Sequence, residues 1–158
     1  RTNIALYEAQ KMLKEAQEED DKTGLSRCYN IMSQIYTVKR LDSMAFEWQL
    51  KEIELTEKYD LENYNISQTY SQISSYYINT NQPEKALEAL KKADATAYSP
   101  TQKISVQLEY VNYYSKFGDM QAAEKILNEC KTAFDQDKRL WSIKKRLYNI
   151  EYVYYLQS

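Results

Sequence analysis

Few residues in this chain could do chemistry, and they lie far apart in the sequence. The 158 residues include no histidine, which removes the commonest general base and the commonest metal ligand. Cys28 and Cys130 are the only cysteines, and two isolated cysteines cannot build a zinc site. Gly24 and Gly118 are the only glycines, so the chain has no glycine-rich loop that could cradle a phosphate.

Paired carboxylates are the remaining candidates for acid–base catalysis. Glu18 and Glu19 are adjacent, and one residue separates Glu52 from Glu54. No pattern joins either pair to a pocket or to an activating neighbour, so we expect these carboxylates on the surface of helices. The sequence therefore predicts no catalytic residue, no metal site and no cofactor, and indicates a protein that is not an enzyme.

Charge and hydropathy argue against nucleic-acid and membrane partners. The net charge is −2 with both signs interspersed, which creates no field for nucleic acid or for a membrane surface. The longest uncharged run, residues 63–83, is too rich in Ser, Asn, Gln and Thr to span a bilayer. Asp135 and Asp137 dilute the one basic cluster, which is predicted to be a solvated helix face. The cluster consists of Lys138, Arg139, Lys144, Lys145 and Arg146.

The composition predicts helices throughout. Only 2 glycines and 2 prolines are present, too few turn residues for an all-β fold, and the Ala, Leu, Glu, Lys and Gln content favours helix. Residues 68–93 have the pattern of two helices joined by a tight turn. Apolar or small residues recur at steps of three and four before Asn81, which tolerates a left-handed turn, and Pro83 then opens the second helix.

The same order of residues recurs on either side of this stretch. Tyr36, Tyr77 and Tyr114 stand at intervals of 41 and 37 residues, each shortly before a predicted turn. In the earliest copy, Gln49 and Glu52 stand where a large and a small apolar residue are expected. The small residues that follow the three turns are Ala45, Ala86 and Ala123.

This order of large, apolar, small and aromatic residues resembles the tetratricopeptide repeat family from about Ala5 to Tyr155. The resemblance implies an all-α fold of about eight helices, stacked as antiparallel pairs in a right-handed superhelix. A single array is expected over residues 1–158, as a fragment of a longer protein, because the chain begins at Arg1 rather than Met. Its expected parts are a half repeat at 3–20, repeats at about 23–59, 61–97 and 99–134, and a half repeat at 138–157.

Local signals set the expected helix boundaries. Residues 22–25 are predicted to be a connection broken by Gly24, and Asp42 is expected to cap the helix that follows. The next helix is expected at 61–80, and the last at 139–156. Residues 99–102 have the sequence of a capping box, with Pro100 at the first helical position.

The resemblance also implies a function. Tetratricopeptide repeats are adaptors that bind peptides or proteins in a concave groove, so this chain is expected to be a protein-interaction scaffold. Long repeats rich in Tyr and Gln look like those of larger bacterial signalling or regulatory proteins, which implies a sensory or regulatory domain, periplasmic or cytoplasmic. The expected partner is a protein or peptide, including another segment of the same protein or a second copy. An all-helical enzyme domain with an unrecognised site is the alternative.

The residues expected to face the groove lie one turn apart on the first helix of each pair. They are Asn30, Gln34, Thr37, Ser71, Ser75, Ile78, Leu108, Asn112, Ser115, Asn149 and Val153. None is Lys or Arg, so we expect the groove to prefer neutral or apolar segments over acidic tails. Cys28 and Cys130 are expected to be buried packing residues that a linear array keeps out of disulfide reach.

Overall fold

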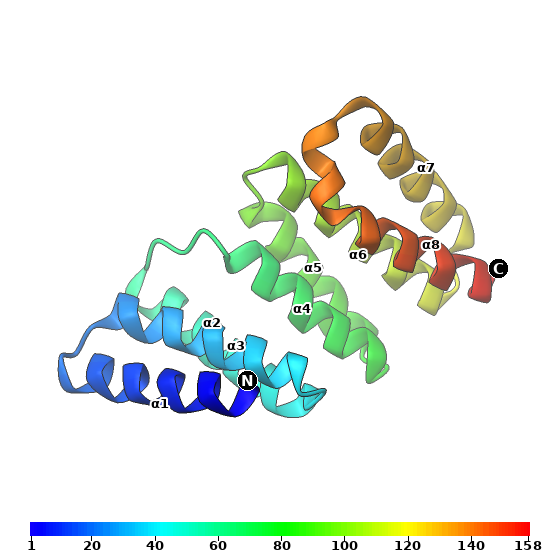
Figure 1. The fold of residues 1–158 in the computed structure, drawn as a ribbon. Coiled ribbons are helices and arrows are strands. Elements are labelled where there is room, and N and C mark those ends of the chain that lie inside the picture. Colours follow the sequence, from blue (N-terminus) through cyan, green and yellow to red (C-terminus); the bar gives the residue numbers. More distant parts are fainter. The chain divides into compact units, whose positions relative to one another are not determined.

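The computed structural model describes residues 1–158, and helices are its only regular elements (Figure 1). The α-helices are α1 (Thr2–Glu18), α2 (Lys22–Val38), α3 (Asp42–Tyr59), α4 (Ile66–Asn79), α5 (Pro83–Thr96), α6 (Pro100–Phe117), α7 (Met120–Gln136) and α8 (Lys144–Gln157). A short 3₁₀ helix, η1 (Lys138–Ile143), leads directly into α8. The all-α fold of about eight paired helices predicted from the sequence is therefore confirmed. No helix combines the length and the apolarity needed to cross a membrane.

Contacts along the chain define two compact units, residues 1–73 and residues 74–158. The boundary falls inside α4. Each unit has helix pairs packed around its own interior. The continuous single array over residues 1–158 stays a prediction.

In the first unit, α2 packs against both α1 and α3. The contact between α1 and α2 buries Ala9, Met32 and Ile35. Ala9 is small, so the two helices can approach closely, and each buried Met or Ile side chain contributes about 1.5–3 kcal/mol to folding. Partly buried neighbours cover this cluster: Leu6, Ile31, Tyr36 and Trp48.

In the second unit, α6 is the central helix and packs against α5, α7 and α8. Ala86 and Ala123 are fully buried, as expected for small residues at helix contacts. The main core joins α6, α7, η1 and α8. Its buried members are Leu108, Val111, Ala123, Leu127, Cys130, Phe134, Leu140, Leu147 and Ile150.

Side-chain caps begin several of the helices. The carboxylate of Asp21 accepts the Gly24 N–H at 2.9 Å, and that of Asp119 accepts the Ala122 N–H at 3.0 Å. These bonds satisfy backbone donors that have no partner inside the helix. The predicted left-handed turn at Asn81 is confirmed by its φ of 59°, and α6 ends at Gly118 with a φ of 95°. Glycine is the residue that adopts this conformation without steric cost.

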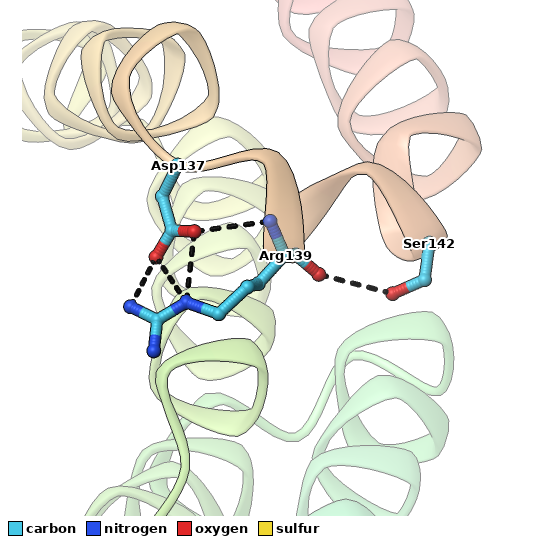
Figure 2. Close-up of polar contacts among 3 residues, drawn as sticks. All are labelled: Asp137, Arg139 and Ser142. Carbon is cyan, nitrogen blue, oxygen red and sulfur yellow. Dashed lines mark hydrogen bonds and ion pairs between the residues drawn. The ribbon is translucent and has the colours of Figure 1, made fainter.

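The connection from α7 to α8 is stabilised by Asp137, as Figure 2 shows. Its carboxylate accepts the backbone N–H of Arg139 at 3.0 Å and the guanidinium of the same residue at 2.7–3.0 Å. The Ser142 hydroxyl donates to the carbonyl of Arg139 at 3.5 Å. These hydrogen bonds from Arg139 lower the pKa of Asp137. Arg139, one member of the basic cluster, therefore stabilises the backbone conformation between α7 and α8.

Some predicted boundaries are wrong. Residues 22–25 belong to α2, because Asp21 caps the start of that helix. Gly24 does not break the helix; its lack of a side chain leaves room for the capping carboxylate, which would collide with a Cβ at this position. Asp42 is the first residue of α3 and makes no cap. Asp60 adopts a left-handed conformation that ends α3, and residues 61–65 form a loop before α4.

Two further signals in the second half of the chain differ in detail. Ser99 accepts the Gln102 N–H at 3.2 Å, as a capping box requires. The Gln102 side chain, however, accepts the N–H of Tyr98 at 3.1 Å. Residues 139–143 lie in η1, so the last α-helix starts at Lys144 rather than at Arg139.

Candidate functional site

The eleven residues expected to face a groove differ widely in exposure. Gln34, Thr37 and Asn149 are exposed, whereas Asn30, Ser75, Asn112 and Val153 are partly buried. The other four, Ser71, Ile78, Leu108 and Ser115, are buried at 0–3 % exposure. A side chain without exposed surface packs inside the protein and cannot contact a partner there, so only the first seven stay candidates for partner binding.

Three of these candidates form a polar stripe on α2, in the first unit. Asn30, Gln34 and Thr37 recur at helical spacing, so they lie on one side of α2. The Gln34 amide donates to the side-chain oxygen of Asn30 at 2.6 Å. That contact leaves the Asn30 amide nitrogen available to donate elsewhere, and it donates to Glu52 on α3 at 3.1 Å.

Glu52 is buried at 1 % exposure, although the sequence placed it on a helix surface. Its carboxylate accepts three hydrogen bonds, all from uncharged groups. The donors are Asn30 at 3.1 Å and Thr69 at 3.0 Å to Oε2, and Asn63 at 2.8 Å to Oε1. Burial raises the pKa of Glu52, and the three donors oppose part of that rise.

The Glu52 network connects α2, α3, the loop at residues 61–65 and the start of α4. Asn63 also donates to the hydroxyl of Thr56 at 3.4 Å, and its own side-chain oxygen accepts the Asn65 N–H at 3.0 Å. The loop is thereby held against α3. Removal of the carboxylate would leave several of these donors without acceptors in a buried place.

A cavity of about 540 Å³ opens beside this network. Glu52 lines it from α3, and α2 contributes Ser26, Arg27 and Asn30. The loop contributes Asn63 and Asn65 among others. The walls therefore combine uncharged hydrogen-bonding groups with apolar surface around one buried carboxylate, which is the composition of a small-ligand pocket.

The second unit has its own buried carboxylate, Glu109 on α6, at 2 % exposure. Two groove candidates, Ser75 and Asn112, donate to its Oε1 at 2.6 and 3.0 Å. Arg146 on α8 donates to its Oε2 at 2.9 Å. Unlike Glu52, this carboxylate has a cationic partner. The predicted solvated face for Arg146 is therefore wrong, since its guanidinium pairs with a buried acid.

The sequence contained a weak signal for both glutamates. Glu52 breaks the repeat pattern at a position where a small apolar residue is expected. Glu109 stands three residues after Val106, on the helix face that Val106 and Tyr110 share. A polar residue inside an apolar stripe is either unsuited to the fold or hydrogen-bonded within it.

A model of the family described as 26S proteasome subunit RPN7 matches residues 37–158. The match runs from the end of α2 to the C-terminal residue, and it includes Glu52 and Glu109. It is not a match to the tetratricopeptide repeat family, and it gives no support to a bacterial context. No curated protein and no solved structure matches the chain.

Proposed function

The chain belongs to the family of 26S proteasome subunit RPN7, and we propose from this membership that it is a helical scaffold that binds other proteins within a multi-subunit assembly. The observation that carries the proposal is the extent of the match, which includes every helix from α3 to α8. The name of that family describes a subunit of a larger complex, and subunits need surfaces for their neighbours. The proposal assigns the chain no catalytic role.

The exposed groove candidates are the proposed contact points. In the first unit these are Gln34 and Thr37 on α2, and in the second unit Asn149 on α8. They are uncharged, so a partner would contact them through neutral hydrogen-bonding or apolar groups rather than through acidic ones. Another segment of the same protein or a second copy is included among such partners. No feature of the structure favours the narrower role in bacterial signalling.

Photo-cross-linking of the full-length protein in its native assembly tests this proposal. A photoreactive amino acid is placed at Gln34, Thr37 or Asn149, and in matched controls at Glu54 on α3 or Lys125 on α7. All five side chains are exposed, so the substitutions should leave the fold unchanged. We expect discrete protein adducts from the first three positions and few from the two controls.

Two results would contradict the proposal. If the full-length protein sediments as a free monomer in gently lysed cells, it is not part of an assembly. If the controls give the same adducts as the candidate positions, the protein has partners, but the proposed contact points are not where they bind.

A further inference from the structure

The carboxylate of Glu52, beside the cavity, is hydrogen-bonded, but no cation of the protein neutralises its charge. Glu52 is 1 % exposed and has no cationic partner in the protein, whereas the buried Glu109 is paired with Arg146. Three uncharged donors stabilise the Glu52 carboxylate, but they do not neutralise its charge. Burying an unpaired carboxylate is unfavourable unless a cation compensates it.

The hydrogen bonds of Glu52 leave one position open. A carboxylate oxygen has about two lone-pair sites. Asn30 and Thr69 both donate to Oε2, so its sites are taken. Only Asn63 donates to Oε1, so one acceptor site remains on that oxygen. Glu52 is part of the wall of the 540 Å³ cavity, which offers a route to that site.

We propose that this cavity binds a single primary ammonium group, the end of a lysine side chain of a partner protein, which forms an ion pair with Glu52. A guanidinium fits less well, because its fork needs two acceptor atoms side by side and Oε2 is already occupied. The slender four-carbon stem of lysine can cross the cavity, and the ammonium can donate to more than one oxygen there. Ser26, Thr23 and Asn65 supply such oxygens in the wall.

Two charged side chains at the rim of the cavity would affect the residues that neighbour the bound lysine in the partner. Arg27 and Glu62 are exposed residues that line the cavity. The Tyr64 hydroxyl donates to Glu62, but this hydrogen bond does not remove the charge of that carboxylate, so the rim has both a guanidinium and a carboxylate. Arg27 would repel a second cation that lies next to it, and Glu62 would repel a neighbouring acidic residue. The inference rests on the proposed function only in naming a protein as the source of the ammonium.

Nuclear magnetic resonance titration of the chain tests the proposal with small probes. The probes are Nα-acetyl-lysine methylamide, its Nε-acetylated form, the arginine analogue, and glycine methylamide as an N-terminal ammonium. The first probe should shift the side-chain amide signals of Asn30 and Asn63 with a millimolar Kd, since it makes few contacts. The acetylated form should bind roughly tenfold or more weakly, because it lacks the charge. Stronger binding of glycine methylamide than of the lysine probe would mean that the site selects chain termini.

Variants separate this site from general electrostatics. Glu52→Gln should abolish the response, and the matched change Glu54→Gln, at an exposed position of the same helix, should preserve it. Arg27→Gln should strengthen binding of the lysine probe, because a repelling charge is gone. If Glu52→Gln fails to fold, the titration of the wild-type Glu52 carboxyl by carbon NMR replaces it, and the lysine probe should lower its pKa.

The inference fails if the lysine probe leaves the amide signals of Asn30 and Asn63 unchanged. It also fails if the acetylated probe or the arginine probe binds as tightly as the lysine probe. These outcomes are distinguishable from failure of the proposed function, because the probes need no protein partner. Probe binding by a protein that forms no assembly would retain the site and refute the scaffold. If the assembly forms equally well with Glu52→Gln and the probes cause no change in the signals, the scaffold proposal stands and the lysine site is refuted.

Discussion

Arg146 donates through Nη2 to Oε2 of Glu109 at 2.9 Å, which forms an ion pair between α8 and α6. The Glu109 side chain is 3 % exposed and that of Arg146 is 32 % exposed, so the pair lies at the edge of the main core of the second unit. Ser75 and Asn112 satisfy the other carboxylate oxygen. The pair therefore fixes α8, which has few buried residues of its own, against the central helix.

Replacing Arg146 by Ala should destabilise the second unit by about 2–4 kcal/mol, because it leaves Glu109 as a buried charge without a cation. The measurement is the free energy of unfolding from denaturant titration. Lys145→Ala is the matched control, since Lys145 is exposed on the same helix and should cost about 0.5 kcal/mol or less. Equal stability of the two variants would show that water compensates Glu109 and that the ion pair contributes nothing.

The two thiols should be unreactive in the folded protein. Cys28 and Cys130 are free and buried at 3 % and 1 % exposure. Burial raises the pKa of Cys28 and raises that of Cys130 to about 12, so the reactive thiolate is scarce at neutral pH. Alkylation with iodoacetamide followed by mass spectrometry should label neither thiol until denaturant is added. An exposed reference thiol, Ser158→Cys, should react at once, and equally fast labelling of Cys130 would contradict its burial.

The helix pairs were predictable from the sequence because they depend on local patterns. The periodic apolar residues, Pro83 and Pro100 at helix starts, and Gly118 at a helix end each act within a few residues, and the structure confirms them. The two buried glutamates were not predictable in the same way. What buries Glu52 is a set of donors up to 22 residues away in the sequence, and Arg146 lies 37 residues from Glu109. Such partners become visible only once the helices are stacked.

The same reasoning explains the mixed fate of the groove candidates. The structure places them on α2, α4, α6 and α8, but spacing alone does not tell which side of a helix meets a neighbour. Leu108 is fully buried because α6 is the central helix of its unit, with neighbours on several sides. Asn30 is only partly buried although it has the same expected place in the repeat. Whether the exposed candidates contact a partner stays a prediction.

Enlarging Ala123 should overpack the contact between α6 and α7. Ala123 is fully buried in the main core of the second unit. Ala123→Leu should therefore cost about 1–3 kcal/mol in the free energy of unfolding. Ala95→Leu, at an exposed alanine of α5, is the matched control and should be nearly neutral. An unchanged unfolding midpoint for Ala123→Leu would mean that the site contains space that the structure does not show.

The stability of the first unit should depend on pH through Glu52. Its pKa in the folded protein is raised above the ordinary value of 4.5 by burial, so the folded state holds the proton more tightly than the unfolded state. The stability that this group contributes is complete below about pH 4.5 and declines as the pH rises through the higher, folded pKa. Most carboxylates that are paired in the folded state have the opposite effect, so wild-type protein alone cannot reveal this one.

The comparison with Glu52→Gln isolates this dependence. Glutamine has no titrating carboxyl, so the free energy of unfolding of wild type minus that of the variant should fall between pH 4.5 and neutral pH. The constant part of that difference reflects the changed hydrogen bonds to Asn30, Asn63 and Thr69 and does not bear on the prediction. Glu54→Gln, at an exposed position of the same helix, is the matched control for the substitution itself. A difference that rises with pH for Glu52→Gln would show that the three donors outweigh burial and that the folded state prefers the charged carboxylate. The three donors alone would then stabilise the charged Glu52 carboxylate, and no cation in the cavity would be required to compensate it.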